Sequence, residues 1–334
     1  VFLLDPEEAH RLSVRALALA GGFDIGRDLL RATFRPDATP RPVKLWGLTF
    51  KNAVGLAAGY DKDGDAWRGL SCLGFGHIEL GTVTPRPQAG NPKPRVFRLA
   101  DHQGAINRLG FPGAGAEVVA ERILGARAGD TVVGMNLGKN KDTPNEEADE
   151  DYLSLVRTFA PLADYLVINV SSPNTVGLRR LQARDALGGL LQTVMAEMQV
   201  QRAAERRPLP LLVKIAPDLD SNELDDALAA ILDNGVDGVI ATNTTLDRDT
   251  IAGHPHAAQA GGLSGAPLRR RATDVVREVH HRTSGRLPII GVGGVASAHD
   301  AREKLDAGAS LVQFYTGMIF EGPGLAKRVV EGLG

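Results

Sequence analysis

The chain has 334 residues, enough for one large domain or two small ones, and 43% hydrophobic and 23% charged residues exclude a disordered or fibrous protein. The formal net charge of −2 supplies no global basic field, so nucleic acid is not an expected partner. A single cysteine, Cys72, excludes a disulfide framework and any metal site built on several thiolates, and we expect it in the core.

The first 44 residues predict two amphipathic helices. Asp5 and Pro6 are a suitable cap and first residue for one helix, and residues 25–34 form the second. Neither helix has the roughly 18 apolar residues needed to span a bilayer, and we expect no secretory signal. The pair is either a helical cap on the following domain or a surface that enters a membrane. Its polar sides carry Arg11, Arg15, Arg27, Arg31 and Arg35.

From about residue 45 the chain repeats one unit: a short apolar run, a turn rich in Gly, Asn or Pro, and a stretch with helical spacing. The eight apolar runs are residues 54–58, 78–83, 131–137, 165–170, 211–215, 238–242, 288–292 and 311–315. Eight such units predict an α/β fold, a closed (β/α)8 TIM barrel, with a doubly wound open sheet as the alternative. We therefore divide the chain into a helical extension, residues 1–44, and a barrel, residues 45–334.

Helices are expected between the runs, for example over residues 146–163, 221–234 and 297–309, with Ser221 as the N-cap of the second. One connection, residues 84–110, is too long for a plain strand-to-helix loop. Its PRVFRL and GAINRL segments predict a small β-hairpin insertion, and long insertions of this kind usually serve function.

Function in such a barrel gathers at the carboxyl ends of the strands. The GVGG and YTG segments after the last two runs favour binding of a phosphate, although two ordinary tight turns would also explain them. Lys62 and Lys214 follow other runs and could balance an anion or form a Schiff base. Five asparagines are further candidates, because their amides both donate and accept hydrogen bonds and so suit a pyrimidine-like ring. They could also serve only as turn formers. They are Asn107, Asn136, Asn169, Asn174 and Asn243.

Two other chemistries have little support. Ser171 and Ser172 have no histidine nearby in sequence and no G-x-S-x-G motif, which disfavours a serine hydrolase. The eight histidines show no metal-ligand spacing with carboxylates, so no metal is expected.

Seven motifs, in order, resemble the FMN-dependent dihydroorotate dehydrogenases: AAGYDKDG, NRLGF, NLGKNKDTP, NVSSPNTVGLRRLQ, KIAPD, TNTT and GVGGV. The resemblance implies oxidation of (S)-dihydroorotate to orotate in pyrimidine (UMP) biosynthesis. Ser172 stands where soluble members carry cysteine, and LDPEEAH opens an extension like that of the membrane-associated members. These two features indicate the quinone-dependent class 2. The resemblance further implies a peripheral protein on the cytoplasmic side of the cell membrane, and a monomer.

The resemblance also implies roles for residues. Ser172 would take the proton from C5 while hydride leaves C6 for N5 of FMN, and Lys62 would bind the substrate carboxylate. The substrate would further contact Asn107, Arg108, Leu109, Gly110, Phe111, Asn169, Asn174, Asn243 and Thr244. FMN would contact Ala58, Gly59, Tyr60, Asp61, Lys62, Thr82, Asn136, Asn169, Lys214, Thr242, Gly265, Gly294, Tyr315 and Thr316. The quinone channel would be lined by His10, Arg98 and Tyr315.

Nothing in the sequence shows what activates Ser172, although closure of residues 175–181 and a water or hydroxyl relay could help. Pro112 and Gly113 stand where family members often have asparagines, which could alter the substrate lid. Three other functions stay open: the same FMN barrel with NAD or fumarate as acceptor, a non-redox phosphate-binding barrel that uses Lys214 as a Schiff-base lysine, and a non-catalytic binding barrel.

Overall fold

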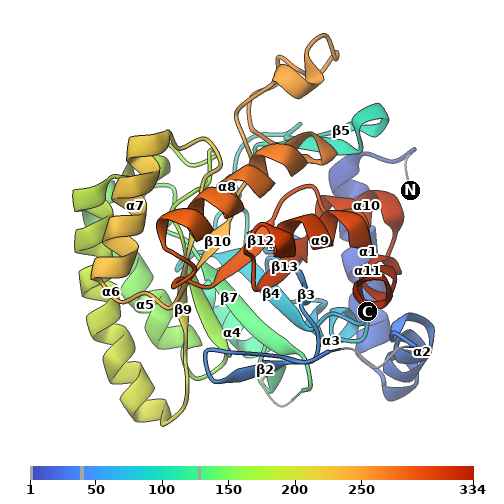
Figure 1. Cartoon of the computed structure of the whole chain (residues 1–334). Coiled ribbons are helices and arrows are strands. Elements are labelled where there is room, and N and C mark those ends of the chain that lie inside the picture. The colour runs from blue at the N-terminus through green and yellow to red at the C-terminus, as the bar shows by residue number, and fades with distance from the viewer. Residues whose placement is uncertain (1–2, 38–40, 127–128) are drawn as a thin grey trace.

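The computed structural model describes residues 3–37, 41–126 and 129–334 (Figure 1). Eight parallel strands close into a barrel and follow one another around it in chain order, which confirms the TIM barrel over the open sheet. They are β3 (Val54–Leu56), β4 (His77–Val83), β7 (Val132–Leu137), β8 (Tyr165–Asn169), β9 (Leu211–Ile215), β10 (Gly238–Ala241), β12 (Ile289–Val292) and β13 (Leu311–Phe314). Each lies within one residue of a predicted run, apart from β3, which ends two residues early.

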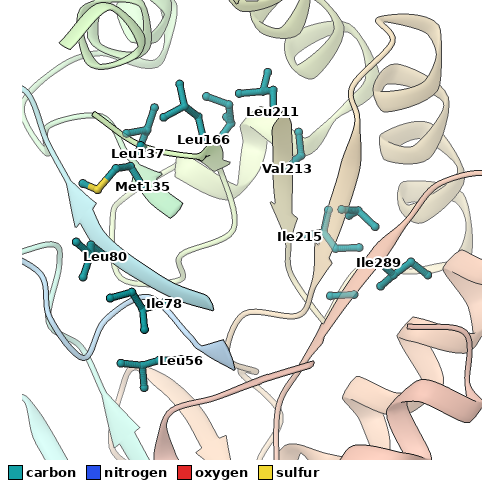
Figure 2. Packing of buried hydrophobic residues seen from close by; sticks show 14 of the residues in the cluster. Leu56, Ile78, Leu80, Met135, Leu137, Leu166, Leu211, Val213, Ile215 and Ile289 are labelled. Atoms are coloured by element: carbon teal, nitrogen blue, oxygen red, sulfur yellow. The ribbon is translucent and has the colours of Figure 1, made fainter. Parts of the chain in front are cut away.

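Helices cover the outside of the barrel because alternate strand residues point outward and are apolar. Figure 2 shows such residues on several strands, among them Ile78, Leu80 and Met135. The covering helices are α3 (Trp67–Leu70), α4 (Ala116–Arg122), α5 (Ala148–Phe159), α6 (Arg184–Glu205), α7 (Ser221–Asp233), α8 (Arg269–Arg282), α9 (Ala298–Asp306), α10 (Thr316–Glu321) and α11 (Leu325–Leu333). Cys72 is buried, as expected of a core residue, just after the short helix α3 ends.

The prediction of Ser221 as an N-cap is wrong by one residue. Asp220 caps α7: its carboxylate accepts the backbone N–H groups of Asn222 and Glu223. The Glu223 carboxylate in turn accepts the N–H of Asp220, which completes a capping box. Asp220 is the N-cap because its side chain accepts hydrogen bonds from two free helical N–H groups, whereas Ser221 already lies inside the helix.

A two-stranded hairpin, β1 (Val43–Leu45) and β2 (Leu48–Phe50), covers the amino-terminal end of the barrel. Leu45, Trp46 and Leu48 pack against the apolar residues inside it, and Phe50 is fully buried there. The sequence did not indicate this hairpin because three-residue strands show no clear alternation. The predicted boundary between residues 44 and 45 falls inside β1.

The insertion after β4 contains the predicted hairpin, formed by β5 (Val96–Leu99) and β6 (Gly104–Asn107). A third strand, β11 (Gly262–Gly265), which follows β10 in the chain, pairs with β6 in antiparallel fashion. The insertion is therefore part of a three-stranded sheet that the hairpin pattern alone could not reveal. Leu99, Ile106, Ile251 and Leu263 form its own small core.

The extension folds as α1 (Pro6–Gly21) and α2 (Asp24–Phe34), and Asp5 caps α1 as predicted. Helix α1 packs against α3 and β5. The backbones of α1 and α3 touch: a Cβ on Gly69 would lie 2.3 Å from the Leu17 carbonyl oxygen, so only glycine allows this approach. Within the described residues, no helix has the length and apolar character that crossing a membrane requires.

Candidate active site

A pocket opens at the carboxyl ends of the barrel strands, where ligand sites of such barrels lie. Its walls bring together many residues that the sequence assigned to the cofactor and the substrate. The predicted cofactor residues among them are Ala58, Lys214, Thr242, Gly265, Gly294, Tyr315 and Thr316, and the predicted substrate residues are Asn107, Asn243 and Thr244. Closure of the barrel thus places members of two separately predicted sets around one space.

A chain of amides and hydroxyls leads from the barrel interior to the pocket. The Asn169 Nδ2 group donates to Thr82 Oγ1 at 2.9 Å and to Asn136 Oδ1 at 3.0 Å. Asn169 Oδ1 accepts the Ser171 hydroxyl at 2.9 Å, and Ser171 Oγ accepts Asn243 Nδ2 at 3.0 Å. All but Asn243 are buried, so these side chains are held in fixed orientations.

Ser172 is buried in the loop after β8, and its Oγ accepts the backbone N–H of Asn174 at 3.2 Å. The Asn174 Nδ2 group donates to Asn107 Oδ1 at 3.3 Å, which ties this loop to the end of β6. Among the described residues, no histidine or carboxylate is hydrogen-bonded to the Ser172 hydroxyl. Thr175 Oγ1 is buried in the same loop without a hydrogen-bond partner in the described chain.

Polar side chains in the segment after β3 make hydrogen bonds to the backbone of the same segment. Lys62 Nζ donates to the Gly59 carbonyl at 2.9 Å, and burial lowers the pKa of Lys62. The Asp61 carboxylate accepts the backbone N–H groups of Asp65 and Ala66, and burial raises its pKa to about 6. The Asp61 side chain is therefore engaged in forming the turn before α3 and does not line the pocket.

The predicted substrate loop, Arg108 to Phe111, is held by side chains that sequence reasoning missed. Gln88 Nε2 donates to the carbonyls of Gly110 and Phe111, at 3.2 and 2.9 Å. Asn91 Nδ2 donates to the Arg108 carbonyl and to the Asn174 carbonyl, both at 3.0 Å, and the Asn91 N–H bonds the Leu109 carbonyl. Pro112 and Gly113, the departure from the family pattern, lie beside a bridge between Gln88 and Gly113.

The predicted closing loop, residues 175–181, is fastened by Arg179. Its guanidinium donates to the Ser171 carbonyl at 3.0 Å, to the Thr244 carbonyl at 2.8 Å and to Asp218 at 2.6 Å. The Arg179–Asp218 ion pair therefore links the loops after β8, β9 and β10. The sequence shows two arginines in this loop, but only the fold identifies Asp218 as the partner of Arg179.

Two of the three predicted quinone residues belong to an aromatic cluster between α1 and the pocket. The His10 ring lies 4.9 Å from the Tyr60 ring and 6.1 Å from the Tyr315 ring, centre to centre. Burial, reinforced by the charge of Lys62, lowers the pKa of His10 to about 4, so the ring is neutral at pH 7. Arg98, on β5, donates to the Leu4 carbonyl at the start of the extension.

Comparisons with known proteins fit this architecture. The family model described as dihydroorotate dehydrogenase matches residues 42–334. A "Dihydroorotate dehydrogenase (quinone)" of Aeromonas hydrophila subsp. hydrophila is 50% identical over 330 residues, which is 99% of this chain and 96% of that protein. A protein of the same name from Acidithiobacillus ferrooxidans is 52% identical over 338 residues, covering 100% of this chain and 92% of its own.

Solved structures agree over nearly the whole chain. The crystal structure of a DHODH from Eimeria tenella in complex with ferulenol superposes with a TM-score of 0.89 at 40% identity. The alignment covers 98% of this chain and 90% of that one. Full-length similarity at this level, in sequence and in fold, leads to one conclusion: the chain belongs to the dihydroorotate dehydrogenase family.

Proposed function

We propose that this enzyme oxidises (S)-dihydroorotate to orotate in pyrimidine biosynthesis, with one FMN as its cofactor and a membrane quinone as the final electron acceptor. One observation carries the proposal: seven of the residues expected to contact FMN and three of those expected to contact the substrate line a single pocket at the carboxyl ends of the strands. Family membership favours this oxidoreductase over a Schiff-base phosphate barrel or a binding protein.

The pocket suits FMN. Gly265 and Gly294 have φ angles of +86° and +75°, and with Thr316 they line a wall rich in backbone N–H groups, which suits a phosphate. Lys214 lines the same pocket and is 6% exposed, so its charge would be felt strongly by a reduced flavin ring. When bound, FMN would accept the hydride from C6 and pass its electrons to the quinone.

Side chains at the mouth can hold the substrate. Asn107, Asn174 and Asn243 present amide groups that match the alternating N–H and C=O groups of the pyrimidine ring. Lys62 uses one of its three N–H groups on the Gly59 carbonyl, which leaves two for the substrate carboxylate. A carboxylate bound there would favour the charged state that burial of this lysine disfavours.

Ser172 Oγ would remove the proton from C5. An aliphatic hydroxyl is a weak base, so its own proton must pass to another acceptor as the C5 proton arrives. Thr175 Oγ1 is buried in the same loop without a partner in the described chain, so it would orient a water molecule that accepts the Ser172 proton and passes it to solvent. The Arg179 contacts hold this loop against the loop after β10, which would limit the access of bulk solvent to the site.

The extension would supply access to quinone and to the membrane. Tyr315 lines the pocket and also faces His10 on α1, so the aromatic cluster joins the pocket to the extension. Large apolar side chains on the two helices and at their junction are at least half exposed: Leu12, Leu19, Phe23, Ile25 and Leu29. An apolar face of this kind suits a monomer on the cytoplasmic surface of the cell membrane.

Anaerobic spectroscopy tests the proposal. Dihydroorotate should bleach the flavin of the purified protein, and a quinone should restore the colour while NAD and fumarate should not. Recovery with NAD or fumarate would instead assign a soluble acceptor. A colourless protein that lacks FMN, or a flavin that dihydroorotate does not bleach, would refute the proposed reaction.

The variant Ser172→Ala tests the base. It should bind FMN normally and slow flavin reduction at least about 100-fold, the usual size of a general-base contribution. Ser154→Ala is the matched control, because Ser154 is exposed on α5 and should reduce its flavin at the wild-type rate. An unchanged rate of reduction in the Ser172 variant would remove this residue from the mechanism.

A further inference from the structure

Glu79 is a fully buried carboxylate that none of the assigned roles uses. It lies in the middle of β4 and its side chain points into the barrel, since its neighbours Ile78 and Leu80 point outward. Burying an isolated carboxylate is costly unless it is paired and hydrogen-bonded. A charge placed at the centre of the barrel, below the pocket, therefore calls for a function.

Four polar groups from four different strands surround this carboxylate. Glu79 Oε1 accepts Asn136 Nδ2 at 2.7 Å and lies 3.8 Å from Lys214 Nζ. Glu79 Oε2 accepts Gln313 Nε2 at 2.9 Å and faces the Tyr165 hydroxyl at 3.5 Å. Burial, followed by the nearby Glu79 charge, raises the pKa of Tyr165 well above its usual range, so this hydroxyl stays protonated and can donate.

The carboxylate fixes the direction of the amide chain above it. A carboxylate only accepts hydrogen bonds, so Asn136 must turn its Nδ2 group toward Glu79 and its Oδ1 toward Thr82 and Asn169. Asn169 must then donate with Nδ2, which leaves its Oδ1 to accept from Ser171. Each amide of the chain that leads to the pocket is oriented by the one below it.

The Glu79 carboxylate also lies close to Lys214, a positively charged side chain that lines the pocket. Lys214 lines the pocket and its Nζ approaches Glu79 at 3.8 Å, beyond hydrogen-bond distance, so the interaction is one of charge. At low local dielectric a negative charge at this distance offsets much of the positive potential that Lys214 projects into the pocket.

We infer that Glu79 is a positioning residue for the cofactor site: its carboxylate orients the Asn136–Asn169 amides and moderates the charge of Lys214, and it thereby sets the reduction potential of the bound flavin. The inference rests on the proposed function, because it takes the occupant of the pocket to be FMN. Glu79 does not line the pocket and is therefore not a catalytic residue.

The test is the midpoint potential of bound FMN in Glu79→Gln, measured by anaerobic equilibration with a reference dye. Removal of the negative charge leaves Lys214 uncompensated, so the flavin should become easier to reduce. We expect the equilibrium constant for reduction to rise at least tenfold, or about 30 mV for a two-electron couple. Glu79→Asp, which keeps the charge, should stay closer to the wild type than Glu79→Gln does.

Asp151→Asn is the matched control. Asp151 is also a buried carboxylate, on α5 outside the barrel, where it accepts the backbone N–H of Asn140 at 2.8 Å. This variant should leave the potential unchanged. If FMN is bound and the equilibrium constant for its reduction in Glu79→Gln lies within threefold of the wild-type value, the inference is overturned.

A double variant isolates the part of the effect that acts through Lys214. In the Lys214→Met background, Glu79→Gln should shift the flavin potential less than it does in the wild type, because the part of the effect that acts through the charge of Lys214 is gone. A shift as large as that in the wild type would contradict the inference. The dye measurement does not use dihydroorotate, so it can fail while the substrate assignment stands, whereas a wild-type protein without FMN would refute the proposed function itself.

Discussion

Replacing Arg95 with methionine tests how the extension is held to the barrel. The Arg95 guanidinium donates through Nε and Nη2 to the two carboxylate oxygens of Glu7 on α1, at 3.1 and 2.7 Å. Its Nη1 donates to the carbonyls of Ala89 and Asn91 in the insertion, at 2.7 and 2.9 Å. One side chain thus fastens α1 to the segment that also supports the substrate loop.

The structure sets the size of the effect. The Arg95 side chain is 8% exposed, and breaking a buried ion pair by removing one partner costs 3–5 kcal/mol. Glu7 is 24% exposed and can be rehydrated, so we expect the lower limit, about 3 kcal/mol. At about 2.1 cal/mol/K per residue, a chain of 334 residues has an unfolding entropy near 0.7 kcal/mol/K, so the Tm should fall by about 4 °C.

Calorimetry at pH 7 measures this Tm, and hydrogen exchange of the α1 amides shows whether the loss is local to the extension. Arg157→Met is the control, because Arg157 also makes two hydrogen bonds to a glutamate, Glu197, but is 58% exposed. An exposed pair of this kind contributes less than about 1 kcal/mol. Equal Tm values for the two variants, with unchanged exchange in α1, would refute the reasoning.

Two further predictions concern stability. Because the folded-state pKa of His10, about 4, lies below its ordinary value of 6.5, the unfolded chain binds a proton first as pH falls, and stability is lost between pH 6.5 and 4. His10→Gln should flatten that slope in urea unfolding by up to about 1.4 kcal/mol per pH unit, and an identical slope would contradict the burial argument. Asp220→Ala should cost about 1 kcal/mol of unfolding free energy, whereas a larger loss in Ser221→Ala would contradict the capping assignment.

Much of the barrel could be predicted because each strand carries its own signal. The run at residues 211–215 is apolar apart from Lys214 and coincides with β9, since a parallel strand inside a helical layer is buried on both sides. The same reasoning failed for the short hairpin β1–β2 and for β11, a four-residue strand that contains two glycines. Segments this short owe their structure to the surfaces on which they pack.

The candidate site was predictable as a set of residues but not as a network. Polar groups after the strand runs could be assigned to one mouth because parallel strands end at the same face of a barrel. The side chains that hold that mouth, such as Arg179, Gln88 and Asn91, lie in loops and have no diagnostic spacing. Glu79 gave one usable signal, a carboxylate within the otherwise apolar run IELGTV.

The sequence by itself determined the order of the eight barrel strands and the helices between them, the turns that follow those strands, and the types of residue that face the pocket. These properties depend on neighbours within a few residues, where alternation and capping act. Only the tertiary structure decided which distant groups meet: Glu79 and Gln313 are 234 residues apart, and Glu7 and Arg95 are 88 apart. Such pairs exist only after the chain folds: the barrel sets the register of β4 against β13 through β3, which lies between them, and α1 docks on β5.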